Sequence, residues 1–245
     1  MNGDNFMKHT HHYTRKFLLT SALTATLVLP NASIPQAFAA DAIAKADLAP
    51  LPLQLPLPTA KGTPDNLPEG PNVEKFTDKP RPAFMAPKGV KNVALGKKVT
   101  CSIEKLYSGT LSQITDGKKD PDDEQAVEMK KGVQWVQIDL ENVHPIYAIL
   151  LWHDHRWLQV FQDVVVQAAD DAEFTKNIRT IFNNDLENQA GRGIGTDKQY
   201  FETAEGKLID TKGIKARYLR FYSKGSNMTA YNVYQEIEVY ALPAQ

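Results

Sequence analysis

The chain has 245 residues, of which 42% are hydrophobic and 23% charged, so it is long enough for one or two domains with a real core. Its 28 basic and 29 acidic residues give a net charge of −1, which excludes a nucleic-acid-binding protein that works through bulk positive charge. Its single cysteine, Cys101, excludes an intramolecular disulfide framework and a cysteine-based zinc finger.

Residues 1–39 have the order of a secretory signal peptide. Lys8 and Arg15 belong to a positive segment, residues 17–30 are apolar, and residues 37–39 read Ala-Phe-Ala, a pattern typical of a cleavage site. The apolar stretch is shorter than the roughly 20 residues of a spanning helix, and no later apolar stretch reaches that length. We therefore expect an exported protein without membrane insertion, in the periplasm, at the cell surface or outside the cell.

Residues 40–91 have the composition of a proline-rich linker, with ten of the 15 prolines of the chain. Each proline removes a backbone donor and fixes φ, so residues 51–58 favour an extended polyproline conformation over a helix. We expect a semi-rigid spacer, with a docking peptide for a partner protein as the alternative. Residues 84–87 are expected to pack on the following domain as its first covered edge.

Residues 92–242 form the predicted domain, whose hydrophobic pattern is that of β-strands. Residues 135–140 alternate, and residues 146–152 are continuously apolar, as in a strand buried on both faces. Further strands are expected at residues 163–168, 217–222 and 236–240, shorter ones at 99–103, 180–183 and 200–203, and a turn at 171–176. Short strands separated by Gly, Asn and Asp predict an all-β sandwich or barrel.

Four sequence motifs follow one another in an informative order. They lie at residues 92–97, at 114–117 followed by 135–140, at 217–221 and at 236–240. In this order they resemble the motifs of discoidin domains, also called coagulation factor 5/8 type C domains, which include the family 32 carbohydrate-binding modules. The resemblance implies a jelly-roll β-sandwich of the galactose-binding type. The single Cys101 and the long stretch 183–200 differ from the family pattern.

The resemblance also implies a structural Ca²⁺ site near the Asp-Gly loop, because members of the family often hold one there. Asp116, Asp120 and Glu236 are the expected ligands, and residues 122–124 are expected to face solvent. Calcium takes six to eight oxygen ligands, which a tight acidic loop can supply. A solvated acidic turn without metal is the alternative.

The expected ligand-binding loop follows the apolar strand 146–152, since this loop lies at or near the ligand-binding end of the family fold. A sugar offers an apolar C–H face to an aromatic ring and hydroxyls to fixed polar groups. The candidate ligand-binding residues are His153, His155, Arg156 and Trp157, with Asn184 from a later loop. Alternatively, the histidines cap the strand end, or His153 and His155 begin a metal site.

The sequence contains no G-x-S-x-G, H-E-x-x-H or contextual S-x-x-K motif, and residues 191–195 are a glycine-rich turn without the context of a nucleotide fingerprint. The leading hypothesis is a non-catalytic, lectin-like module that binds galactose-type or other extracellular glycans. One alternative is a structural or adhesive module that binds other surface proteins. Another is an accessory subunit of a polysaccharide-degrading enzyme.

Overall fold

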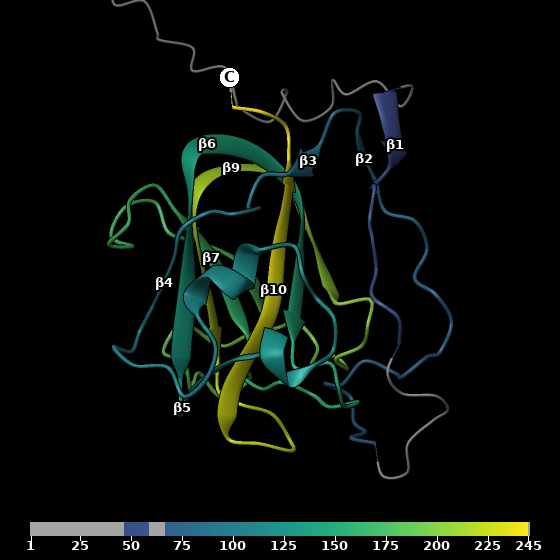
Figure 1. Cartoon of the computed structure of the whole chain (residues 1–245), viewed down its shortest axis with the longest axis vertical. Helices are drawn as coiled ribbons and strands as arrows, with labels where there is room; N and C mark the ends of the chain where they lie inside the picture. Colours follow the sequence, from purple (N-terminus) through teal and green to yellow (C-terminus); the bar gives the residue numbers. More distant parts are fainter. Residues whose placement is uncertain (1–46, 59–66, 245) are drawn as a thin grey trace, which may run out of the picture. The chain divides into compact units, whose positions relative to one another are not determined.

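The structure is a computed structural model, and it describes residues 47–58 and 67–244 (Figure 1). The predicted signal peptide, residues 1–39, lies outside the described residues. The described residues form an all-β protein whose longer 3-10 segments are η3 (Leu111–Thr115) and η4 (Asp123–Gln125). Among the described residues, none of the helices has the length and apolar character needed to cross a membrane.

The described part of the chain contains ten strands. They are β1 (Leu48–Pro50), β2 (Met85–Pro87), β3 (Lys91–Asn92), β4 (Val99–Cys101), β5 (Val127–Lys131), β6 (Gln134–His153), β7 (Val165–Ala169), β8 (Arg179–Asn183), β9 (Lys207–Ser223) and β10 (Tyr231–Ala241). Of these, β6, β9 and β10 are much longer than the strands that the sequence pattern predicted. Two predicted strands merge into β6. The strand expected at residues 200–203 is reduced to an isolated bridge between Val160 and Phe201, while β5 was not predicted.

Eight of these strands form one hydrogen-bonded sheet that folds over into the two layers of a β-sandwich. In the first layer, residues 134–140 of β6 lie between β4 and residues 217–223 of β9. The same part of β9 pairs with β7, and β7 pairs with β8 on its other side. In the second layer, residues 145–153 of β6 lie between β10 and the first part of β9, and β3 and β5 pair with β10. Both long strands therefore belong to both layers.

The fold-over is produced where β6 and β9 bend together, at the upper end of Figure 1. The pairing of β6 with β9 shifts register between Asp139 and His144. Glu141 has φ 68° and Gly213 has φ 77°, so the chain takes a left-handed conformation on both strands at the bend. A Cβ atom on Gly213 would lie 3.2 Å from the ring of Tyr147, so this position has little room for a side chain.

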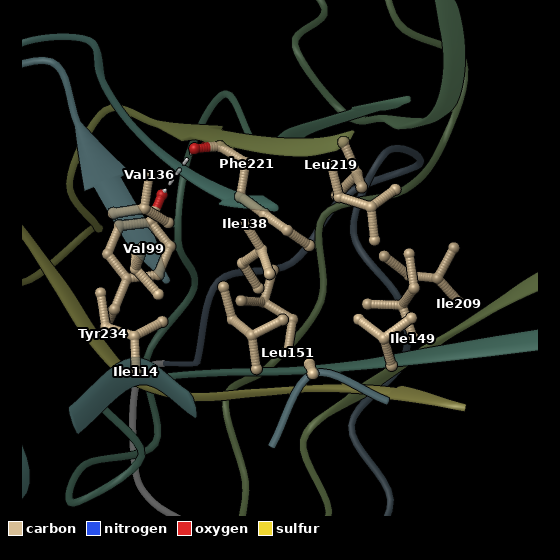
Figure 2. Close-up of a cluster of buried hydrophobic side chains, with 14 of the residues drawn as sticks. Val99, Ile114, Val136, Ile138, Ile149, Leu151, Ile209, Leu219, Phe221 and Tyr234 are labelled. Carbon is tan, nitrogen blue, oxygen red and sulfur yellow. Dashed lines mark hydrogen bonds between the residues drawn. The ribbon is translucent and has the colours of Figure 1, made fainter. Parts of the chain in front are cut away.

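The core lies between the layers, and Figure 2 shows two facing rows of apolar side chains. The first layer contributes Val99, Val136, Ile138, Leu219 and Phe221, and the second contributes Ile149, Leu151, Ile209 and Tyr234, all at most 7% exposed. The hydroxyl of Tyr234 donates to the carbonyl oxygen of Phe221 at 3.3 Å and so links the two layers. The predicted inward face of residues 136, 138 and 140 is confirmed, because all three are fully buried.

The described part of the proline-rich segment, residues 47–58 and 67–90, packs against the second layer, and we call it the strap. Its two strands, β1 and β2, pair with each other in antiparallel register. Leu51 and Ala86 are buried in one cluster with Ala148, Leu150, Trp152 and Tyr240. This cluster explains why residues 146–152 are apolar throughout: one face meets the core and the other meets the strap.

Polar contacts fasten the strap further along its length. Arg81 donates from Nη1 to the carbonyl oxygen of Gly206 at 2.9 Å and from Nη2 to that of Glu205 at 3.0 Å. Lys207 forms an ion pair with Glu74 at 2.5 Å. These residues do not form the semi-rigid spacer expected from their prolines, because their apolar side chains have a sheet face to cover. The expected packing of residues 84–87 on the domain is confirmed.

Candidate functional site

Several loops meet at the end of the sandwich opposite the bend, in the lower part of Figure 1. β6 ends there beside Tyr234 of β10, and Val165 of β7 pairs there with both Tyr222 of β9 and Asn183 of β8. The loops 154–164 and 224–230 therefore leave the sheets at the same end. We call this the loop end, and the predicted ligand-binding stretch lies in its first loop.

Hydrogen bonds tie loop 154–164 to loop 224–230. The backbone N–H of Val160 donates to Oδ1 of Asn227 at 2.8 Å, and the N–H of Asn227 donates back to the carbonyl oxygen of Val160 at 3.0 Å. Ser226 donates from Oγ to Oε1 of the buried Gln159 at 2.6 Å, and Gln159 donates to the carbonyl oxygen of Asp154 at 2.7 Å. Each loop thus fixes the conformation of the other.

Arg156 is held within its own loop. Its Nε and Nη2 donate to the two carboxylate oxygens of Asp154 at 2.7 and 2.9 Å, and its Nη1 forms an ion pair with Asp123. Burial raises the pKa of the Asp154 carboxyl, and burial lowers the pKa of Arg156. The guanidinium of Arg156, expected to contact ligand, therefore braces the loop through a bidentate carboxylate contact.

Trp157, the next residue, has a large exposed ring. Its side chain is 60% exposed, and Met228 on the adjoining loop is 58% exposed. A tryptophan ring with this exposure offers an apolar face together with an N–H donor. Of the five predicted ligand-binding residues, Trp157 is the most accessible at the loop end.

His153 and Asn184 were predicted to contact ligand, but both are fully buried, and we remove them from the candidate surface. Nδ1 of His153 lies 2.8 Å from Oε1 of Glu202, and its ring stacks on Phe161 with centroids 4.3 Å apart. Oδ1 of Asn184 accepts from the N–H of Val164 at 2.7 Å. Each side chain thus satisfies a polar group inside the fold, while Nε2 of His153 and Nδ2 of Asn184 have no hydrogen-bond partner among the described residues.

His155 is also buried, at 3% exposure, and it connects two loops. Its Nε2 lies 2.9 Å from the carbonyl oxygen of Lys119, and its backbone N–H donates to Oε1 of Gln235 at 3.2 Å. It therefore connects the Asp-Gly loop to β10, and its side chain is buried. Among the described residues, no three His, Cys, Asp or Glu side chains are grouped so as to hold a metal, neither around His153 and His155 nor around Asp116, Asp120 and Glu236.

The Asp-Gly loop covers a buried carboxylate on β10. Glu236 is fully buried, and its Oε2 accepts from the N–H of Gly117 at 3.2 Å. Its Oε1 has no hydrogen-bond partner among the described residues. Burial, with repulsion from Glu238 and Asp116, raises the pKa of Glu236 to about 9. The Asp-Gly loop thus brings Asp116 close to Glu236.

Asp120, the third expected calcium ligand, presents its backbone to the same region: its carbonyl oxygen accepts from Nε2 of Gln235 at 3.4 Å. Lys119 forms an ion pair with Glu238 at 2.5 Å, so a side-chain cation already neutralises one carboxylate of this surface. Asp123 was expected to face solvent and is exposed, although it pairs with Arg156. No sequence signal pointed to Lys119.

The bracing residues Gln159, Glu202 and Asn227 were missed by the sequence analysis. Each lies in a loop without hydrophobic periodicity, and each finds its partner far away in the sequence, 49 residues away for Glu202 and 67 for Gln159 and Asn227. Only the assembled loop end shows why these polar residues are there.

No known family model matches this sequence, and no curated protein is significantly similar to it. Solved structures with a similar fold include a chitosan-binding module of a Paenibacillus sp. IK-5 chitosanase/glucanase (19% identity, TM-score 0.43, 61% of this chain and 98% of that chain). A Streptococcus pneumoniae fucose-binding module is also similar (18% identity, TM-score 0.45, 62% of this chain and 99% of that chain). Part of a Clostridium perfringens family 89 glycoside hydrolase is similar as well (16% identity, TM-score 0.44, 63% of this chain and 16% of that chain). Similarity at this level carries no argument about the ligand of this chain.

Proposed function

We propose that this protein is an exported, non-catalytic, lectin-like module that binds extracellular glycans at its loop end. The observation that carries the proposal is the exposed ring of Trp157 on a loop that is braced from both sides. A ring on a loop whose backbone is already held in place gives a sugar a stacking face without a large cost of ordering that loop. The resemblance to discoidin domains supports the same function and favours galactose-type sugars.

Binding at such a site is reversible docking. The C–H face of one sugar ring stacks on Trp157, and the hydroxyls exchange water for polar groups of the surrounding loops. Because this exchange brings little net free energy, a single site is expected to be weak. Attachment to a surface therefore depends on many sites acting together.

The test measures retention of the protein, beginning at Ala40, on immobilised galactose, fucose, chitosan and mannuronate. Chitosan and fucose are named for solved modules of similar fold, and a third such module is in complex with 4,5-unsaturated mannuronic acid, which is related to mannuronate. Trp157→Ala is expected to abolish retention on the sugar that binds the unaltered protein. Val143→Ala, which changes a 56% exposed side chain at the bend, is the matched control.

Two results would count against the proposal. Equal retention of Trp157→Ala and the unaltered protein would place the binding surface elsewhere. Failure of the folded protein to bind any of the four sugars would favour the adhesive alternative, in which the loop end contacts another surface protein.

We further propose that a structural Ca²⁺ braces the Asp-Gly loop, held by the carboxylates of Glu236 and Asp116 and by oxygen atoms of the loop, including those of Asp120. The buried Oε1 of Glu236, which lacks a hydrogen-bond partner among the described residues, fits a cation ligand. When bound, the ion supplies positive charge that offsets repulsion among these carboxylates.

Thermal unfolding in calcium and in a chelator tests this site. Calcium is expected to raise the melting temperature of the unaltered protein and to leave that of Glu236→Gln unchanged. Glu238→Gln is the control, because Glu238 is paired with Lys119 and accepts from Tyr240. Calcium stabilisation that survives in Glu236→Gln would contradict the assignment.

A further inference from the structure

A second aromatic surface lies beside the loop end, formed by Tyr107 and Tyr231. Their rings meet edge to face, with centroids 5.3 Å apart and planes at 88°. Tyr107 is 61% exposed, and Tyr231 is partly exposed. The backbone N–H of Tyr107 donates to the carbonyl oxygen of Glu128 at 2.9 Å, which holds the main chain of Tyr107 beside β5.

The frame of this surface is fixed by Asn232, which is fully buried. Its Nδ2 donates to the carbonyl oxygens of Lys130 and Gly132, both at 2.8 Å. Its Oδ1 accepts from Oγ of Ser223 at 2.7 Å and from the N–H of Gly225 at 2.9 Å. These four hydrogen bonds join the turn before β6 to the start of loop 224–230, so the residue next to Tyr231 cannot move independently of either.

The same loop connects this surface to Trp157. Asn227, which is bonded to Val160 of the Trp157 loop, precedes Tyr231 by four residues. A fully extended chain of four residues spans at most about 14 Å, so Tyr231 lies within that distance of Asn227, and the exposed Met228 lies between them in the sequence. Val160, in turn, follows Trp157 by three residues. Exposed apolar side chains normally occur singly, so several on adjoining braced loops indicate a binding surface.

We propose that Tyr107 and Tyr231 bind a second sugar ring of the same glycan whose first ring stacks on Trp157. The ligand is then an extended chain and not a single terminal sugar. This inference rests on the proposed function. Lys131, whose Nζ lies 4.9 Å from the centroid of the Tyr231 ring, places a positive charge beside this position. A carboxylate on the second sugar is therefore accepted more readily than an amine.

The experiment compares the affinities for a monosaccharide and for its tetramer by calorimetry. The probes are three series of different charge: galactose, glucosamine and mannuronate. We expect the unaltered protein to bind the tetramer of its sugar more tightly than the monomer. Tyr107→Ala with Tyr231→Ala is expected to lower the tetramer-to-monomer affinity ratio by about tenfold, the effect of one lost stacking contact.

Tyr218→Ala is the matched control, since Tyr218 is a partly exposed tyrosine on the first layer, where it pairs with Asp139 near the bend. Its affinity ratio is expected to equal that of the unaltered protein. A thermal melt of each variant establishes that it is folded. If the double variant does not fold, the single variants Tyr107→Phe and Tyr107→Ala are used in its place, because they change only the more exposed ring.

The outcomes separate the two proposals. An unaltered protein with equal affinity for monomer and tetramer, or a double variant with an unchanged ratio, would overturn the second sugar position and leave glycan binding at Trp157 intact. Absence of binding to all three series would overturn the proposed function, and this inference with it.

Discussion

His153 and Glu202 form a polar pair in the interior of the protein. Both side chains are fully buried, and the ring of His153 also meets Tyr234 at 4.8 Å. We expect Glu202→Ala to lower the free energy of unfolding by about 2 kcal/mol, because it leaves a buried histidine nitrogen without its partner. Denaturant unfolding measures the change.

Glu173→Ala, at an exposed position, is the control for that substitution and should alter stability by less than about 0.5 kcal/mol. If Glu202→Ala kept its stability and instead lost glycan binding, the pair would belong to a binding site and not to the core.

Asp139 and Arg217 give a pH-dependent contact on the outer surface of the first layer. Arg217 donates to both oxygens of Asp139, at 2.7 and 2.8 Å, and this hydrogen bonding holds the pKa of Asp139 below its ordinary value of 3.8. A lowered carboxyl pKa contributes stability that is present above pH 3.8 and is lost as the pH falls through the folded-state value. We expect Asp139→Asn to melt below the unaltered protein at pH 6, with a difference that shrinks below pH 3.8. A difference that grows in acid would contradict this sign.

At this scale the sequence predicted side-chain direction better than side-chain role. Alternation placed Val136 and Ile138 in the core, because a strand has a fixed period of two. It could not show that His153 points inward, since its partner Glu202 is 49 residues away in a loop without periodicity. Arg156 was identified as a loop residue, but its carboxylate partners Asp154 and Asp123 depend on how the loops fold.

Among the elements, the strap has the clearest energetic consequence. Leu51 is 7% exposed and packs with Trp152, whereas Leu57, six residues later, is 85% exposed. We expect Leu51→Ala to lower the free energy of unfolding by about 2 kcal/mol through lost burial and a residual cavity. Leu57→Ala, the same substitution in the same segment, should change it by less than about 0.5 kcal/mol. Equal effects in denaturant unfolding would mean that the strap does not stabilise the domain.

The sequence identified this element only in part. Its prolines correctly excluded a helix, and the continuous apolar run of residues 146–152 correctly required cover on both faces of that strand. Neither pattern identifies the segment that covers the second face of that strand. Leu51 reaches the sheet through a pairing of β1 with β2 that spans more than 30 residues, a separation that local propensity does not encode.

For the molecule as a whole, the two bent strands make the layers a single cooperative unit. Trp135 lies in the first layer and Trp152 in the second, and β6 contains both. We expect Gly213→Ala, which puts a side chain on a residue with φ 77° at the bend, to destabilise the protein by about 1–2 kcal/mol. Denaturant unfolding can be followed by tryptophan fluorescence in two proteins, one that retains only Trp135 and one that retains only Trp152. In both, Gly213→Ala should lower the unfolding midpoint by the same amount. Different shifts for the two tryptophans would show that the layers unfold separately.

The hydrogen bonds between loops 154–164 and 224–230 also have a consequence for the time course of the proposed glycan binding. A surface that is already in its bound shape needs no rearrangement before or after encounter. The observed association rate should then rise linearly with sugar concentration, with no plateau, and weak affinity would be expressed as rapid dissociation. Each copy of the protein would dissociate quickly from any one sugar, while many copies together would remain attached to a surface that is covered with such sugars.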